Sequence, residues 1–274
     1  MPADRHDAEA DGALFDEATE AFFDYKENCA LYNYVEKPLL LRLMGPLEGR
    51  TVLDVGCGYG AYSRLMADRL LAKKVVALDA SEHMLEAAES FGRSERLTYV
   101  QLDATRAAEA EGGPFDLALV NFVLMYLDDE KELRSACRAI YEALAPGGKT
   151  VGLVPLCNQK TEFSVEYGRR FLGRLVPDQS IDASQRPFHG EGVEDGAQVT
   201  VAFFQPGGEQ ESARVDMRFF SPRKYERAFR LAGFHAVRWH RADVVKEGME
   251  RLGREYFEPY LQPQPKYIAF ECLK

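Results

Sequence analysis

The stretch Thr51-Val-Leu-Asp-Val-Gly-Cys-Gly-Tyr-Gly60 decides the fold of this 274-residue chain. An apolar run leads into a turn in which glycines occupy three alternate positions, Gly56, Gly58 and Gly60. Because glycine has no Cβ, such a turn bends sharply and lets a ligand approach the backbone. Asp54 places a carboxylate at the same turn, which disfavours a phosphate and favours a cationic, amine-bearing ligand. The stretch therefore predicts a buried strand that ends at a small-molecule site.

Strand-like and helix-like segments alternate on both sides of this turn. Such alternation predicts an α/β fold with a doubly wound, mostly parallel sheet covered by helices on both faces. The expected strands are 50–55, 74–79, 97–102, 115–120, 149–156, 234–241 and 266–273, and the expected helices are 61–72, 81–91, 129–144 and 222–232. Pro146-Gly147-Gly148 is expected to form a turn before the fifth strand.

The flanking segments suggest one domain with two additions. Residues 1–12 are small and acidic, which predicts a disordered tail, and residues 13–274 are expected to form a single domain. Within it, 13–45 should be helical, over 14–27 and 34–44. An insertion over 158–221 should contain a helix at 161–175 and a hairpin of strands at 197–204 and 213–220.

Composition excludes several partners. The net charge is −10 and no stretch concentrates lysine and arginine, so we expect no binding to nucleic acid and no adsorption to an anionic membrane. No apolar run is long enough to span a bilayer. The five cysteines are scattered, which predicts reduced thiols and a cytoplasmic protein. Because no two of them lie close together in the sequence, we expect no metal site.

Acidic or amide side chains end the first four expected strands. Asp79 follows Asp54 by 25 positions and Asp103 follows Asp79 by 24, and Asn121 ends the fourth strand. The carboxyl ends of parallel strands meet at one edge, where open sheets bind ligands. Asp79 can accept from the hydroxyls of a ribose, and Asp103 from the amine of an adenine. The alternative is that Asp79 and Asp103 only cap helices.

Two cofactor classes fit a glycine-rich turn after a strand. Nicotinamide-binding turns favour the spacing G-x-G-x-x-G. Here the spacing is G-x-G-x-G, Asp54 precedes it, and Asp103 has no role in nicotinamide binding. The pattern therefore favours S-adenosylmethionine.

Five motifs in order make residues 50–156 resemble class I S-adenosylmethionine-dependent methyltransferases. They are Val52-Leu-Asp-Val-Gly-Cys-Gly-Tyr-Gly60, Ala77-Leu-Asp-Ala-Ser81, Gln101-Leu-Asp-Ala104, Phe115-Asp-Leu-Ala-Leu-Val-Asn-Phe122 and Leu144-Ala-Pro-Gly-Gly-Lys149. The resemblance implies a seven-stranded Rossmann-like sheet with an antiparallel last strand. It also implies S-adenosyl-L-methionine as cofactor and S-adenosyl-L-homocysteine as product. The cofactor-binding residues that it implies are Tyr32, Asp54, Gly56, Cys57, Gly58, Asp79, Ala80, Met84, Asp103, Ala104, Asn121 and Phe122.

The segment Leu31-Tyr-Asn-Tyr-Val-Glu-Lys-Pro38 is similar to the N-terminal lid of small-molecule members. The expected helix Arg223–Phe234 and the ending Tyr267–Cys272 resemble those of small-molecule N- and O-methyltransferases such as the toxoflavin-type enzymes. The residues expected near a substrate are Tyr25, Tyr126, Phe163, Tyr167 and His189. Each has a plainer alternative, because aromatics at helical spacing often only pack a core and a loop histidine is often solvated.

The expected function is transfer of a methyl group to nitrogen or oxygen of a small-molecule acceptor by a monomer or homodimer. A hydroxyl or carbon acid would need a general base. No motif in the sequence indicates which residue that base would be, so the catalytic residues stay unassigned. Two alternatives remain: a methyltransferase acting on protein or RNA, and a non-catalytic S-adenosylmethionine-binding protein.

Overall fold

The computed structural model describes residues 26, 28–157, 169–171, 173–176, 195–204, 211–261 and 266–274. Its centre is a seven-stranded sheet in the order β3-β2-β1-β4-β5-β10-β9. The strands are β1 (Thr51–Val55), β2 (Lys74–Asp79), β3 (Leu97–Gln101), β4 (Phe115–Val120), β5 (Leu144–Pro155), β9 (Ala236–Arg241) and β10 (Tyr267–Leu273). The first five are parallel, and β10 is antiparallel to both β5 and β9. The predicted doubly wound sheet with an antiparallel last strand is confirmed.

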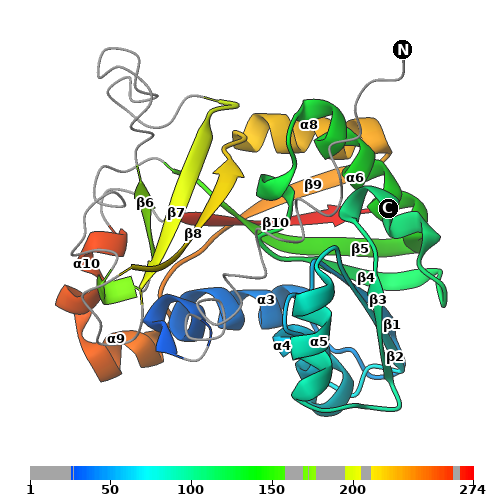
Figure 1. Ribbon diagram of the computed structural model, residues 1–274, viewed down its shortest axis with the longest axis horizontal. Coiled ribbons are helices and arrows are strands. Elements are labelled where there is room, and N and C mark those ends of the chain that lie inside the picture. The colour runs from blue at the N-terminus through cyan, green and yellow to red at the C-terminus, as the bar shows by residue number, and fades with distance from the viewer. Residues whose placement is uncertain are drawn as a thin grey trace.

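Helices cover both faces of this sheet (Figure 1). One face packs against η3 (Ala104–Glu109), α6 (Glu130–Ala143) and α8 (Pro222–Ala232) around Leu53, Val120 and Phe270. The other face packs against η1 (Tyr32–Glu36), α3 (Lys37–Met44), α4 (Ala61–Arg64) and its continuation η2 (Leu65–Arg69). The helix α5 (Glu82–Ser90) follows β2, and η4 (Leu124–Tyr126) follows β4.

Local signals in the sequence place most helix ends. The Ser81 hydroxyl accepts from the Met84 N–H at 3.1 Å and begins α5, and Asp129 accepts from the Lys131 and Glu132 N–H groups and begins α6. Such caps satisfy backbone donors that have no partner inside the helix. Pro222 at the first turn and a left-handed Gly233 bound α8, as predicted.

Four segments differ from the sequence-based expectation. The strand β5 begins at Leu144 and not at 149, because Leu144 pairs with Phe115 of β4. The register then shifts at a bulge that contains Pro146-Gly147-Gly148, and pairing with β4 resumes at Lys149. The predicted helix 161–175 is wrong at its end, where β6 (Gly173–Val176) pairs with β7. The segment 104–114, for which no element was predicted, contains η3. The helices α9 (Lys246–Leu252) and α10 (Arg254–Leu261) were not expected.

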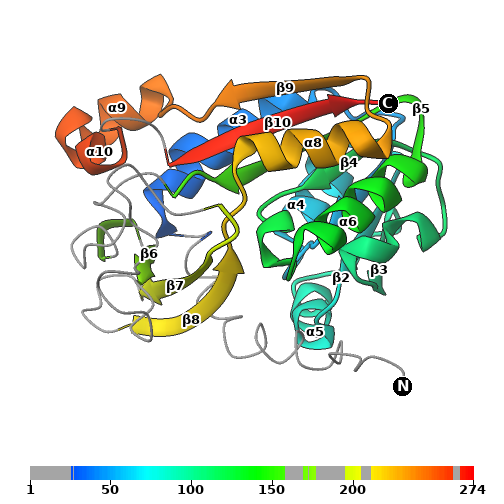
Figure 2. The same ribbon diagram turned by 90° about the horizontal axis from the view of Figure 1, so that it is seen from above.

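A smaller sheet lies to one side of the large one (Figure 2). Its order is β6-β7-β8, and β7 (Gln198–Phe204) and β8 (Glu211–Arg218) form the predicted antiparallel hairpin. An apolar cluster of Met125, Cys157, Val199, Met217 and Phe219 packs this sheet against the segments that follow β4 and β5. The insertion therefore adjoins the edge at which the parallel strands end.

The five cysteines all lie within the described residues, where each is buried and none forms a disulfide, as predicted. Of the helices in the described ranges, none has the length and apolar character needed to cross a bilayer. The predicted tail at 1–12 and nearly all of the predicted helix 14–27 lie outside the described residues.

Candidate functional site

The glycine turn forms as the sequence predicts and docks against β2. Gly56, Gly58 and Gly60 all have positive φ, at 67°, 54° and 76°. The Cys57 N–H donates to the Leu78 carbonyl at 2.8 Å, which fixes the turn beside the end of β2. A Cβ on Gly56 would lie 2.3 Å from Val123 Cγ2, whereas a Cβ on Gly58 would meet no atom of the chain within 4 Å. The turn is therefore closely packed at Gly56 and open at Gly58.

Asp79 holds this turn from the end of β2. Its carboxylate accepts from the Gly58 N–H at 2.7 Å and from the Ser81 N–H at 3.1 Å. Burial raises the pKa of this carboxyl, and the hydrogen bonds from Ser81 and Gly58 oppose that rise. Ser81, and not Asp79, is the residue that caps α5. Asp79 retains lone pairs at the sheet edge, and its role as a ribose ligand stays a prediction.

Two predicted cofactor residues, Ala80 and Met84, follow Asp79 in the sequence. The Ala80 carbonyl accepts from Gln101 Nε2 at 3.1 Å, and Met84 is buried in the first turn of α5. Beside them, the Leu102 N–H donates to the Asp79 carbonyl at 2.9 Å and brings the end of β3 alongside. The ends of β2 and β3 therefore lie together, as the sequence predicts.

Asp103 caps a helix, which is the alternative to its predicted contact with an adenine. Its carboxylate accepts from the Thr105 N–H at 2.7 Å and from the Thr105 hydroxyl at 2.5 Å, and thereby begins η3. Asp103 remains partly exposed, and Ala104 beside it is buried. A contact between Asp103 and an adenine stays a prediction.

Asp54 lies beneath the turn. It is 3% exposed and accepts a 2.6 Å hydrogen bond from the Ser63 hydroxyl in α4. Burial raises the pKa of the Asp54 carboxyl to about 6, and the Ser63 hydrogen bond and the nearby Lys26 ammonium oppose that rise. A cation bound beside Asp54 would favour its ionised form.

The end of β4 carries an unsatisfied acceptor and a strained residue. Asn121 Oδ1 is buried and has no hydrogen-bond partner in the part of the chain that the structure describes. Phe122 has a positive φ of 54°, and its ring packs edge-on against Tyr267 with centroids 5.0 Å apart. Backbone strain of this kind persists only where the surrounding structure enforces it, and it concentrates at functional sites.

The N-terminal helices add residues that the sequence analysis did not name. Tyr32, which was predicted, lies on η1 with its ring 5.9 Å from that of Tyr62 in α4. Glu36, Tyr59 and Tyr62 are buried at the same edge, and Lys26 Nζ faces both tyrosine rings. Tyr59 and Tyr62 could have been found from their place in and after the glycine motif. Lys26 and Glu36 carry no such signal, because only tertiary packing brings them to the turn.

Of the five predicted substrate residues, the structure describes only Tyr126. It is nearly buried and packs on the clusters that hold β7 and β8, close to Phe122 and Met125. Tyr25, Phe163, Tyr167 and His189 lie outside the described residues. Within the described ranges no group of three or more His, Cys, Asp or Glu side chains could hold a metal ion.

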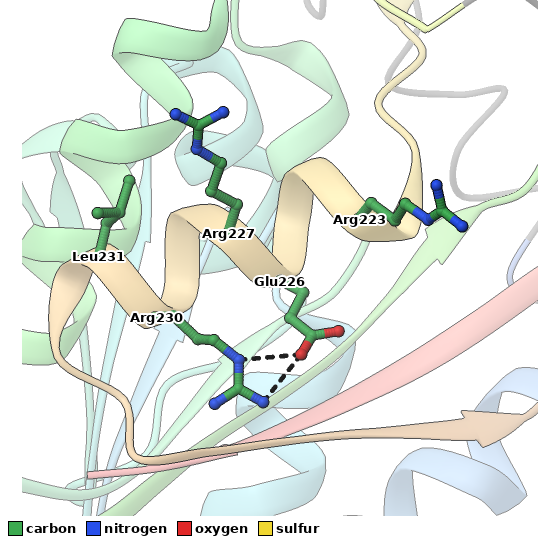
Figure 3. A pocket seen from close by; sticks show the side chains of 5 residues that line it. All are labelled: Arg223, Glu226, Arg227, Arg230 and Leu231. Carbon is green, nitrogen blue, oxygen red and sulfur yellow. Dashed lines mark hydrogen bonds and ion pairs between the residues drawn. The ribbon is translucent and has the colours of Figure 1, made fainter.

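A surface hollow also exists on α8 (Figure 3). It is lined by Arg223, Glu226, Arg227, Arg230 and Leu231, and Arg230 pairs with Glu226 at 2.8 Å. All five residues belong to one helix, and none lies at a strand end. We therefore place the candidate site at the carboxyl edge of the sheet and not at this hollow.

Comparison with known sequences identifies the domain. Residues 52–148 match a family model described as a methyltransferase domain. The ubiquinone biosynthesis O-methyltransferase of Alkalilimnicola ehrlichii is 28% identical over 186 residues, 66% of this chain and 72% of that protein. The malonyl-[acyl-carrier protein] O-methyltransferase of Pseudescherichia vulneris is 29% identical over 172 residues, 60% and 63% of the two chains. The chain spans about half, 48% and 54%, of the length of other curated relatives.

Solved structures share the fold at low sequence identity. A Listeria monocytogenes protein described as a putative S-adenosylmethionine-dependent methyltransferase aligns with a TM-score of 0.59 at 20% identity, over 87% of this chain and 96% of that one. The 1,6-didemethyltoxoflavin-N1-methyltransferase of Burkholderia thailandensis, solved with S-adenosylhomocysteine, aligns with a TM-score of 0.55 at 16% identity, over 100% and 93%. Residues 52–148 thus match a methyltransferase domain, and the chain shares the class I fold of solved structures described as S-adenosylmethionine-dependent methyltransferases.

Proposed function

We propose that this chain is an S-adenosylmethionine-dependent methyltransferase that acts on a small-molecule acceptor. The observation that carries the proposal is the glycine turn, which is open at Gly58 and held by Asp79, with the Asp54 carboxylate beneath it. Carboxylates at this turn suit a cofactor with a sulfonium and an amine. A pyrophosphate would be repelled by them.

The residues at the strand ends fit this cofactor in order. Asp79 would accept from the ribose hydroxyls, and Asp103 and Ala104 would meet the adenine. The amino-acid end would lie along the open side of the turn at Gly58, where the chain leaves space for a ligand. Asn121 Oδ1 would gain a partner there, which accounts for a buried acceptor that is otherwise unsatisfied.

The cofactor supplies a methyl group on sulfur, and the chain supplies alignment and exclusion of water. A lone pair of the acceptor would take this methyl group, the electron pair of the sulfur–methyl bond would stay on sulfur, and an O–H or N–H acceptor would release its proton to a base or to water. Alignment alone contributes on the order of 7–11 kcal/mol to such a reaction. Phe122, Tyr126 and Tyr267 would form the apolar wall on the acceptor side, since they flank the end of β4.

A small-molecule acceptor is favoured over a macromolecule by the net charge of −10, which opposes RNA binding. The related proteins named above are described as a ubiquinone biosynthesis O-methyltransferase, a malonyl-[acyl-carrier protein] O-methyltransferase and a 1,6-didemethyltoxoflavin-N1-methyltransferase. Their acceptors differ in chemistry, so the proposal extends to nitrogen or oxygen of a small molecule and not to one compound.

Titration calorimetry tests the cofactor part of this proposal. We expect S-adenosylmethionine and S-adenosylhomocysteine to bind the full chain and NAD not to bind. Binding of NAD alone would contradict it. A radiolabelled methyl-transfer screen over metabolites, peptides and RNA then tests the acceptor class. Labelled peptide or RNA in place of small molecules would refute that part.

A further inference from the structure

A lysine from the N-terminal segment lies against the glycine turn. Lys26 Nζ is 5.2 Å from the centroid of the Tyr59 ring and 5.4 Å from that of Tyr62. Both distances allow a cation–π contact, which requires about 6 Å or less. Tyr59 stands between Gly58 and Gly60, so the cation lies at the turn itself. The two buried rings therefore form a place for a positive charge, and Lys26 fills it.

Three carboxylates surround this place. Asp54, Glu36 and Asp79 all interact electrostatically with the Lys26 ammonium, and they come from β1, η1 and the end of β2. Burial lowers the pKa of Lys26, and these carboxylates oppose that change. Lys26 in turn opposes the rise in the pKa of both Asp54 and Asp79. The ammonium is therefore a counter-charge to the acidic groups of the turn.

The ammonium is held without a direct ionic bond. Lys26 forms no hydrogen bond and no ion pair within 4.0 Å with any residue of the described ranges, and its ammonium contacts the faces of the Tyr59 and Tyr62 rings. The position of the ammonium therefore depends on the two ring faces and on the electrostatic attraction of the three carboxylates.

The two forms of the cofactor differ by one charge. S-Adenosylmethionine has a sulfonium, an ammonium and a carboxylate, and its net charge is +1. S-Adenosylhomocysteine has lost the sulfonium charge and is neutral overall. A fixed positive charge at the turn repels only the extra charge of the first, because the other charged groups are the same in both.

We propose that Lys26 sets the charge selectivity of the cofactor site, weakening the binding of cationic S-adenosylmethionine relative to neutral S-adenosylhomocysteine. The inference rests on the proposed function. The same repulsion decreases as the sulfonium loses charge during transfer, so Lys26 favours the transition state over the bound cofactor.

An alternative role for Lys26 predicts a different result. If its ammonium bound the carboxylate of the cofactor, removing the charge would weaken both ligands by the same factor, since both have that carboxylate. The ratio of the two dissociation constants therefore separates the two roles, whereas either constant alone would not.

The test is calorimetric titration of both ligands into the full chain and its variants. Lys26→Met should lower the ratio of the S-adenosylmethionine to the S-adenosylhomocysteine dissociation constant by about tenfold, the scale expected for unit charges near a protein surface. Lys26→Gln provides a second neutral side chain and should give the same change. Lys26→Arg keeps the charge and should retain the parent ratio. Lys37→Met is the matched control, because Lys37 contacts the Tyr32 ring at 5.9 Å on the adjoining helix.

Each outcome decides a different claim. A parent chain that binds neither ligand contradicts the proposed function. A parent that binds both, with the same ratio in Lys26→Met and Lys26→Gln, overturns the inference and leaves the proposed function standing. Equal weakening of both ligands also overturns it and assigns Lys26 to the carboxylate. A change of ratio in Lys37→Met as large as in Lys26→Met would show that the effect is not specific to the turn.

Discussion

At the scale of single residues, Asp79 links the fold to the proposed chemistry. It accepts backbone N–H groups from the glycine turn and from the start of α5, and it is also the predicted ribose ligand. Asp116 offers a matched comparison, because its carboxylate accepts the Thr51 N–H at 2.8 Å at the opposite end of β1. Both carboxylates anchor backbone, but only Asp79 lies at the carboxyl edge.

Asp79→Ala should weaken cofactor binding by about 1.5–3 kcal/mol, since hydrogen bonds to a charged acceptor are lost. Asp116→Ala should lower the melting temperature without changing the dissociation constant. Calorimetry and thermal unfolding monitored by circular dichroism measure the two effects. If the Asp79→Ala variant binds the cofactor as tightly as the parent, Asp79 only accepts hydrogen bonds from the backbone and is not a ribose ligand.

Asp54 predicts how cofactor binding depends on pH. Its folded-state pKa is raised to about 6 from the ordinary 3.8. Between these values the folded chain holds a proton that the unfolded chain has lost, so this group's contribution to the free energy of unfolding falls as pH rises. A cationic ligand favours the ionised carboxylate and lowers that pKa. Binding should therefore tighten from pH 5 to pH 7 and be lost progressively below pH 6.

Titrations from pH 5 to pH 8 in buffers of different ionisation enthalpy would measure both the affinity and the proton released near pH 6. Asp54→Asn can still accept from Ser63 and should show a shallower dependence, with the remainder due to Asp79, whose pKa is also raised. An unchanged slope in Asp54→Asn would exclude Asp54 as the titrating group.

At the scale of elements, helix caps connect stability with the site. Ser81 begins α5 beside Asp79, and Asp129 begins α6 on the face that packs with η3 and α8. Loss of an N-cap costs about 1 kcal/mol. We expect Ser81→Ala and Asp129→Ala to lower stability by similar amounts in urea unfolding. Only Ser81→Ala should also weaken cofactor binding, and equal affinities of the two variants would show that α5 does not support the site.

The elements that could be predicted are those with local signals. Each of the strands β1 to β4 has an Asp or Asn within two residues of its end, and α8 has Pro222 and Gly233 at its ends, so their boundaries follow from a few neighbouring residues. The start of β5 could not be predicted, because Leu144 pairs with Phe115 ahead of the unpaired Pro146-Gly147-Gly148 bulge, and no local signal marks that pairing. The strand β6 forms where a helix was expected. It could not be predicted, because its partner β7 is distant in the sequence.

In the candidate site, too, the residues that could be predicted are those with local signals in the sequence. The glycine turn, Asp54 and Asp79 could be found because each lies in or directly after a strand. Asp103 was found, but its hydrogen bonds to Thr105 match its alternative as a cap. Lys26 and Glu36 could not be found, because no spacing in the sequence indicates that their helices pack onto Tyr59 and Tyr62.

At the scale of the whole molecule, the two sheets and the N-terminal helices meet where the parallel strands end. The cluster of Met125, Cys157 and Met217 packs the smaller sheet there, and η1 brings Tyr32 to Tyr62 from the other face. Most of the predicted cofactor residues lie in or directly after β1 to β4, and the proposed acceptor wall comes from the segments beyond them. The proposed cofactor and acceptor sites therefore lie at one edge of the large sheet.

A crystal structure of the full chain with S-adenosylhomocysteine tests this account most directly. We predict electron density along the glycine turn, with the ribose hydroxyls within hydrogen-bond distance of the Asp79 carboxylate and the adenine beside Asp103 and Ala104. Density for the ligand at any other place, with the turn at Gly58 empty, would contradict the account.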